Sequence, residues 1–316
     1  MSRGLRARAR ARAVAALALA GLGVCGAARP AAAYVRYKTA MTGAAFAWPQ
    51  SCVKISVYPR SMADVNGNMD LTNDEITTAA SAAGAAWSAE QNPCSFLAIS
   101  VAPSTAATPI ARYDYKNSLI FRTASWCAPS DGPDMCSYDP AALAITSVFA
   151  NKSTGQIRDA DIEVNSKSFI WADLETNPSA AGRQDLQNAL THEMGHLIGL
   201  DHTCYITGPA PLDENGQPIP SCESASAAVR ATTMFASAEP GDLQKRTLAP
   251  DDKQAICDIY PIAADPMTCT GSGGGGNGGE DSGGCQVAPL GGGGEGVLAV
   301  ALAGLAAALR RRARGR

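Results

Sequence analysis

The chain has 316 residues, of which 46% are apolar and 17% are charged, and its formal net charge is −3. This length can bury a sizeable core, and the composition excludes both a low-complexity chain and a protein with several membrane spans. The charge is unevenly placed: eleven of the 26 basic residues lie in residues 1–33 and 286–316, so residues 34–285 carry a net charge of −13. Because binding to a phosphate backbone needs a basic surface, we expect no nucleic acid partner.

Residues 1–33 have the order of a secretory signal peptide. Five arginines between Arg3 and Arg12 precede an apolar run, Ala13–Gly23, that is too short to span a bilayer. Residues 30–33, Pro-Ala-Ala-Ala, then supply a cleavage site of small residues. We therefore expect cleavage after Ala33 and export of the protein.

Residues 34–265 are predicted to form one domain of the mixed α/β (α+β) class. Alternating apolar and polar residues predict a strand at 52–58, and an Ala-rich helix is expected at about 73–90. Further strands are expected at about 95–101, 117–122, 143–149 and 157–164. Helices at about 183–198 and 249–260 would pack on this mixed, twisted sheet.

The polar loop before the first helix imitates a calcium loop. Residues 64–75 have the ligand spacing of an EF-hand, but Met69 stands where the sharp turn needs glycine. We therefore interpret the loop as a turn, followed by a capping box of Thr72 and Glu75 that opens the helix. Elsewhere, five carboxylates at loops and strand ends could bind Ca²⁺ or form a solvated acidic surface, and the sequence leaves both interpretations open: Asp131, Asp134, Asp139, Asp159 and Asp161.

The residues with the clearest chemistry lie at 192–202, His-Glu-Met-Gly-His-Leu-Ile-Gly-Leu-Asp-His. His192 and His196 are four residues apart, so on a helix they leave the same face and can hold one Zn²⁺. Gly199 can end that helix in a left-handed conformation, after which the chain turns back and His202 becomes a third ligand. Three protein ligands leave the fourth position for water, which distinguishes a catalytic zinc from a structural one.

Glu193 is the predicted general base, because it lies beside the first ligand and can reach a water on the metal. All three histidines of the chain fall in this segment, so no second His-based zinc site is predicted. The alternative function is a surface binding or adhesion module with a vestigial metal site, against which the intact Glu193 argues. A processing peptidase with a single substrate is a further alternative.

The segment 192–202 resembles the zinc-binding signature of the metzincin metalloproteases at every fixed position. Residues from about 46 to 262 are similar to the matrixin branch, although more loosely. The resemblance implies a zincin fold, a secreted zinc-dependent endopeptidase, and a Met-turn formed by Met234 beneath the metal. It also implies a protein or peptide substrate that lies antiparallel to an edge strand starting at Leu143 and Ala144, and an S1′ pocket bordered by Phe235.

Three departures from that branch limit what the resemblance implies. No cysteine switch of the PRCGxPD type precedes Trp48, so the latency mechanism of the family is absent. The His-based structural zinc site of vertebrate matrixins is also absent. Ala236 stands two residues after Met234, where some metzincin branches have tyrosine.

The C-terminal region divides into a Gly-rich linker, 266–285, that ends at Cys285, and an apolar segment with an Arg cluster, 286–316. The apolar run Val297–Leu309 is marginal for a membrane span, and the terminal arginines would stay cytoplasmic. This layout resembles the MYXO-CTERM sorting tail of myxobacterial surface proteins. The resemblance implies cleavage near Cys285 by a sorting peptidase and attachment at the cell surface or outer membrane, and a plain membrane anchor is the alternative.

Eight cysteines remain when Cys25 and Cys285 are set aside, and an even number in an exported chain predicts four disulfides. None belongs to a C-x-x-C pair, so a zinc ribbon has no support. Positions along the chain favour these pairings: Cys127–Cys136, Cys204–Cys222, Cys52–Cys94 and Cys257–Cys269.

Overall fold

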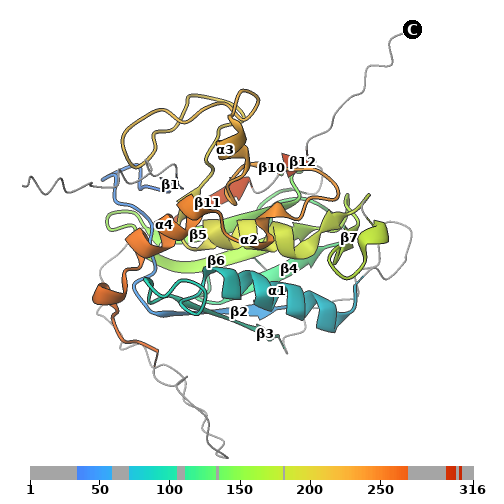
Figure 1. The fold of residues 1–316 in the computed structure, drawn as a ribbon, viewed down its shortest axis with the longest axis horizontal. Coiled ribbons are helices and arrows are strands. Elements are labelled where there is room, and N and C mark those ends of the chain that lie inside the picture. The colour runs from blue at the N-terminus through green and yellow to red at the C-terminus, as the bar shows by residue number, and fades with distance from the viewer. Residues whose placement is uncertain are drawn as a thin grey trace, which may run out of the picture. The chain divides into compact units, whose positions relative to one another are not determined.

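The computed structural model describes residues 34–58, 71–104, 111–132, 135–180, 182–269, 297–303 and 306–307. Its centre is a mixed sheet with the strand order β11-β5-β6-β4-β2-β3 (Figure 1). Strands β3, β2, β4 and β6 run parallel, while β5 runs antiparallel to β6, and β11 to β5. The bounds are β2 (Cys52–Val57), β3 (Ala98–Pro103), β4 (Asn117–Arg122), β5 (Ala144–Asn151), β6 (Ile157–Asn165) and β11 (Val297–Ala303).

Four α-helices occur in the described part of the chain: α1 (Asn73–Trp87), α2 (Leu186–Leu197), α3 (Ala227–Arg230) and α4 (Pro250–Ile259). Helices α1 and α2 lie side by side on the sheet, where α1 contacts β3 and α2 contacts β5 and β6 (Figure 1). The small buried residues Ala80, Ala83 and Gly84 allow α1 to approach the sheet closely. The predicted mixed α/β class is confirmed.

Short strand pairs and 3₁₀ turns lie outside the central sheet. The pairs are β1 (Val35–Arg36) with β9 (Leu200–Asp201), β7 (Trp171–Ala172) with β8 (Gln184–Asp185), and β10 (Ser237–Ala238) with β12 (Ala306–Ala307). Three 3₁₀ turns complete the fold: η1 (Pro178–Ala180), η2 (Gln244–Arg246) and η3 (Ile262–Ala264).

Helix boundaries follow from specific caps. The predicted capping box of Thr72 and Glu75 opens α1. Helix α2 begins at Leu186 rather than near Arg183, because residues 184–185 pair with β7 and the Asp185 side chain accepts the backbone N–H of Asn188 at 2.7 Å. Helix α1 ends at Trp87, short of the expected Glu90, because the backbone is extended at Ser88.

The disulfides confirm the two predicted local loops, Cys127–Cys136 and Cys204–Cys222, and correct the other two pairings. Cys52 pairs with Cys269, and Cys94 pairs with Cys257. The reason is that the chain after α4 returns to the start of the sheet. Ser95 forms a bridge with Pro261, and the N–H of Ile262 donates to the carbonyl of Cys94 at 2.8 Å.

Several expectations fall outside the described residues: the signal peptide, the loop 64–70 with Met69, Asp134, Cys285 and the Arg cluster. The apolar stretch expected at 297–309 contributes strand β11. Among the described residues, no helix is both long enough and apolar enough to cross a membrane.

Candidate metal centre

The three histidines converge on one point. His192 and His196 project from α2, and His202 follows β9. The Nε2 atom of His202 lies 3.2 Å from that of His192 and 3.1 Å from that of His196. Nitrogens bound to one tetrahedral zinc at about 2.0–2.1 Å stand roughly 3.3 Å apart, so the spacing fits a single ion. This cluster could hold a metal ion.

The outer ring nitrogens hold the rings in the tautomer that ligation requires. The Nδ1 atom of His192 lies 2.7 Å from the carbonyl of Thr233, and that of His196 lies 2.8 Å from the carbonyl of Leu200. Donation from Nδ1 leaves each Nε2 lone pair directed at the common centre. Burial lowers the pKa of His196 to about 4 and the pKa values of His192 and His202 well below the ordinary value, so the imidazoles are neutral near pH 7.

The turn after α2 needs a glycine, as predicted. Gly199 has φ +101°, and a β-carbon there would lie 2.5 Å from the carbonyl oxygen of Phe46. Any residue with a β-carbon would therefore be strained here, both by the backbone conformation and by the close approach to Phe46. This turn sends the chain into β9 and brings His202 back to the helix.

Two further residues, Tyr37 and Asp201, support His202 and His196 and were not predicted from the sequence. Asp201 accepts the backbone N–H of His202 at 2.7 Å, and Tyr37 donates its hydroxyl to Asp201. The Tyr37 ring stands edge-on to His196, with centroids 6.1 Å apart. Burial raises the pKa of Tyr37 well above its usual value, which keeps it a neutral donor. Only the pairing of β1 with β9 brings Tyr37 here, so no local pattern indicates it.

Glu193 is fully buried on α2 and faces β5. Its Oε2 atom accepts a hydrogen bond from the hydroxyl of Thr146 at 2.6 Å. Leu143 and Ala144, the residues expected at the start of a substrate-binding edge, are both buried, and β5 begins at Ala144. Strand β5 therefore runs directly beside the predicted base.

Met234 packs against the helix that carries His192 and His196. A β-carbon on Gly195, between the first two histidines, would stand 2.2 Å from the sulfur of Met234. The turn that carries Met234 is tied to α4, because Asp252 accepts the N–H of Thr233 at 2.8 Å. Met234 is thus packed against the ligand helix, although its position in the sequence lies far from that helix.

Lys245 is a buried cation that no local sequence pattern indicates. Its side chain is 1% exposed, and its ammonium donates to the carbonyl of Phe235. Its backbone N–H donates to Asn188 of α2 at 2.7 Å. Burial lowers the pKa of Lys245 to about 7. The residue links the ligand helix to the segment after Met234.

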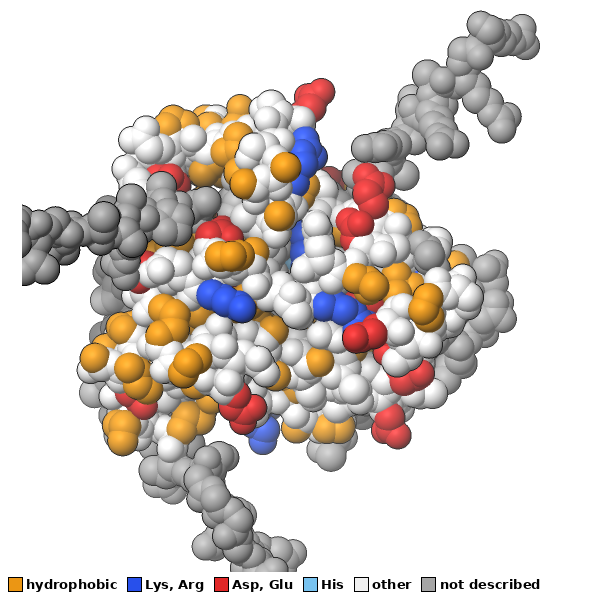
Figure 2. All heavy atoms as spheres, in the orientation of Figure 1, with side chains coloured by type: hydrophobic (Ala, Val, Ile, Leu, Met, Phe, Trp, Pro, Cys, Tyr) orange, Lys and Arg blue, Asp and Glu red, His pale blue; other side chains and the backbone are white. Residues whose placement is uncertain are grey.

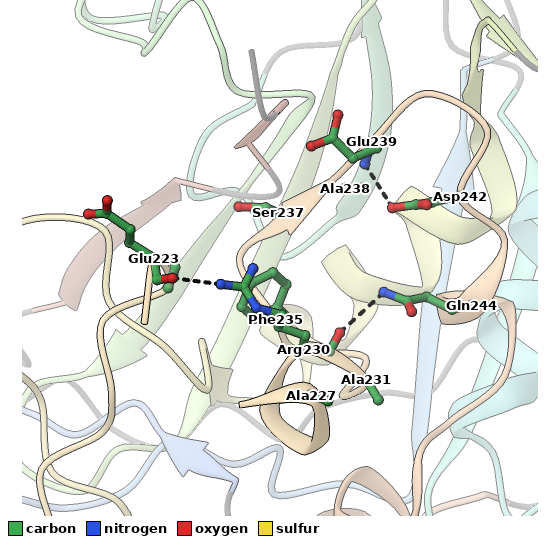
Figure 3. Close-up of a pocket in the computed structure, with 11 residues that line it drawn as sticks. Glu223, Ala227, Arg230, Ala231, Phe235, Ser237, Ala238, Glu239, Asp242 and Gln244 are labelled. Atoms are coloured by element: carbon green, nitrogen blue, oxygen red, sulfur yellow. Dashed lines mark hydrogen bonds between the residues drawn. The ribbon is translucent and has the colours of Figure 1, made fainter. Parts of the chain in front are cut away.

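Phe235 is one of the residues that line a pocket of about 520 Å³ (Figure 3). The guanidinium of Arg230 lies 5.3 Å from the centre of the Phe235 ring and donates to the carbonyl of Glu223 at 2.7 Å. Asp242 accepts the N–H of Glu239 at 2.8 Å on the opposite wall. Phe235 therefore lines a pocket between α3 and β10, and its role in an S1′ pocket stays a prediction. On the face shown in Figure 2, acidic and basic side chains are interspersed.

The aspartates considered for Ca²⁺ are engaged with the backbone. Asp161 accepts the N–H groups of Arg112 and Ser118 at 2.8 and 2.9 Å. Asp159 accepts those of Asp114 and Tyr115 at 2.6 and 2.7 Å. Asp131 and Asp139 likewise accept backbone N–H groups of their own loops. Calcium binding stays a prediction, and within the described ranges the three histidines are the metal-ligand cluster that the structure contains.

Comparison with known proteins assigns no family to this chain. No family model matches the chain. No curated protein matches it either. Among solved structures, the chain is similar to one titled "GM1 bound form of the ECX AB5 holotoxin", with 12% identity, 72% of this chain and 88% of that chain covered, and a TM-score of 0.38. A likeness at this score carries no argument about fold or function.

Proposed function

We propose that the protein is an exported, zinc-dependent endopeptidase of the metzincin type, similar to the matrixins, that hydrolyses peptide bonds at the histidine cluster. The observation that carries this proposal is the convergence of three neutral Nε2 atoms beside the buried carboxylate of Glu193. A structural zinc site would use four protein ligands, whereas this cluster supplies three.

The donor set favours Zn²⁺. Three imidazoles without thiolate suit zinc among the common protein metals, and their hydrogen-bonded Nδ1 atoms match the way such ligands are usually oriented. When bound, zinc supplies Lewis acidity toward the scissile carbonyl and lowers the pKa of a bound water toward neutrality.

The chain's own residues supply the proton transfer. Glu193 accepts a proton from the attacking water and delivers it to the leaving amine. The hydroxyl of Thr146 holds one oxygen of this carboxylate in place. Tyr37, Asp201 and Thr233 hold the ligand segments, so the geometry is fixed before substrate binds.

The substrate we propose is an extended segment of a protein or peptide. The outer edge of β5 accepts an antiparallel strand, as β11 illustrates, and such pairing recognises a backbone with little preference for its sequence. Leu143 and Ala144 would begin this binding edge, and the pocket lined by Phe235 would receive a substrate side chain.

Four disulfides fit an extracellular protein, because such bonds form and persist in oxidising surroundings. Attachment to the cell surface through the C-terminal tail, after processing by a sorting peptidase near Cys285, is part of the proposal.

The test uses residues 34–270, which retain all four disulfides, as wild type and as Glu193→Gln. We expect one zinc per chain in both, measured by metal analysis after dialysis, and cleavage of a peptide library by the wild type alone. Loss of a general base lowers turnover by about 10²–10⁴-fold. Glu90→Gln, at an exposed position after α1 and outside that pocket, is the matched control and should keep nearly full turnover.

Two results would contradict the proposal. Equal cleavage by Glu193→Gln would show that the base is assigned wrongly. A zinc-loaded wild type that cleaves no member of the library would favour the binding module.

A further inference from the structure

Two strands of the C-terminal segment pair with two different strands of the domain. Strand β11 pairs antiparallel with β5 over seven positions, from Val297 opposite Asn151 to Ala303 opposite Ile145. Strand β12 then pairs parallel with β10, where Ala306 and Ala307 lie opposite Ser237 and Ala238. Two residues separate β11 from β12 in the sequence.

These two partner strands flank the histidine cluster. Thr146, which lies opposite Leu302, donates its hydroxyl to Glu193. On the other side, β10 begins three residues after Met234, and the preceding Thr233 carbonyl binds the ring of His192. Strand β11 therefore pairs with the strand beside the base, and β12 pairs with a strand close in sequence to the residue that binds His192.

We propose that strands β11 and β12 occupy the peptide-binding groove of their own chain, and that substrate can enter only after a cut between Cys269 and Val297 separates these strands from the domain. The effect on activity rests on the proposed function, whereas the docking itself does not. The occupant is this chain's own apolar C-terminal segment.

Backbone pairing explains why this segment fits. Without β11, strand β5 would be an edge of the sheet with a row of unpaired backbone groups. Residues 297–307, Val-Leu-Ala-Val-Ala-Leu-Ala-Gly-Leu-Ala-Ala, contain no charge and no proline, so every residue can donate to a ladder. The same lack of sequence preference that suits a broad peptidase lets its own tail bind.

Covalent connection explains how weak pairing could block the groove. A tethered segment competes at an effective concentration on the order of millimolar, while a released segment is diluted to the protein concentration. A cut in 270–296 would therefore change occupancy without any change in the groove. This device would also supply a form of latency in a chain that lacks a cysteine switch before Trp48.

The docking is tested by cross-linking in the exported chain with Cys285→Ser. The pairs Ser147→Cys with Ala301→Cys, and Phe149→Cys with Ala299→Cys, place cysteines on directly opposite residues. We expect each pair to form a disulfide under mild oxidation, detected by non-reducing peptide mapping. The control is Phe149→Cys with Ala303→Cys, which is shifted by four residues, or about 13 Å, and is too far apart to bridge.

The block is tested with a recognition site for a sequence-specific protease inserted in residues 271–284. Hydrolysis of a quenched peptide should rise at least tenfold after the cut and dilution. The double variant Val300→Pro with Leu302→Pro, which disrupts pairing with β5, should be active before the cut. Val287→Pro with Gly293→Pro, outside β11, should remain blocked like the parent.

The outcomes separate the two proposals. Absence of the in-register cross-links, or equal cross-linking of the shifted pair, would overturn the docking. An unchanged rate after the cut, in a chain that cleaves peptides, would overturn the block. In-register cross-links in a chain that is inactive both before and after the cut would leave the docking standing and count against the proposed function.

Discussion

The ligand segment 186–202 and the segment beneath it, 232–252, form one site but are held by different interactions. In the ligand segment, the helical period aligns His192 and His196, and Gly199 returns the chain to place His202. The lower segment depends on contacts between residues far apart in sequence, such as Thr233 with Asp252 and Lys245 with Asn188.

This difference separates what binds the metal from what supports it. Local backbone geometry is sufficient to bring three imidazoles together. Met234, Lys245 and Asp252 lie near the ligand segment because η2 packs against α2 and because Asp252 of α4 accepts the N–H of Thr233. Substitution of a ligand histidine should therefore change metal retention, and substitutions that alter the packing around the ligand segment should change stability first.

Removal of the metal should have the largest effect on stability, because the bound ion holds the three ligands of the ligand segment together. An ion whose free concentration is 1,000 times its dissociation constant stabilises the folded state by about 4 kcal/mol, and a chelator removes that contribution. His202→Ala should lose zinc on dialysis and unfold at the temperature of the chelated wild type, measured by calorimetry. If the chelator does not change the melting temperature of the wild type, the cluster holds no ion in solution.

Gly199→Ala tests the turn between the two ligand elements. The left-handed backbone and the 2.5 Å approach to the Phe46 carbonyl should together lower the free energy of unfolding by about 3 kcal/mol. Gly208→Ala is the matched control, since Gly208 has φ +84° but open space around its β-carbon position, and it should lose only about 1 kcal/mol. Urea unfolding of the metal-free proteins gives both values, and equal losses would exclude the steric contribution.

Gly195→Ala tests the contact between the two segments. The new β-carbon would meet the sulfur of Met234, so we expect a loss of about 1–3 kcal/mol from overpacking. In the double variant with Met234→Ala, the two changes should compensate partly, which a double-mutant cycle measures as a coupling energy. Simple additivity would show that Met234 does not press against the ligand helix.

The pH dependence of stability should show the most gradual effect and report on the lower segment. Burial, with Asp251 beside it, raises the pKa of Asp252 to about 7. Because the folded state holds this proton more tightly than the unfolded chain, stability is full below about pH 4 and falls as the pH rises to about 7, by at most about 1.4 kcal/mol per unit.

Asp161, whose pKa burial and Asp159 raise to about 8, adds to the same slope. The variant Asp252→Asn should flatten the slope between pH 4 and 7 in denaturant titrations. A control variant, Asp213→Asn in the loop 211–218, should keep it. An Asp252→Asn protein with the parent slope would contradict the assignment.

Local geometry explains which features can be predicted from the sequence. The spacing of His192, Glu193 and His196, the glycine at 199 and the short loops Cys127–Cys136 and Cys204–Cys222 all involve residues close in sequence, so helical period and backbone conformation determine them. Alternation and Ala-rich periodicity likewise predicted the strands and helices to within a few residues. The sequence by itself therefore determined the mixed α/β class and the three candidate ligands.

The tertiary structure alone decided the rest. It exchanged the partners of Cys52 and Cys94, placed Thr146 on Glu193, buried Lys245 under Phe235 and brought Tyr37 to Asp201. It also paired residues 297–303 with β5 and residues 306–307 with β10. Each of these contacts joins segments far apart in the chain, and which distant segments meet depends on how all the elements pack together rather than on any local pattern.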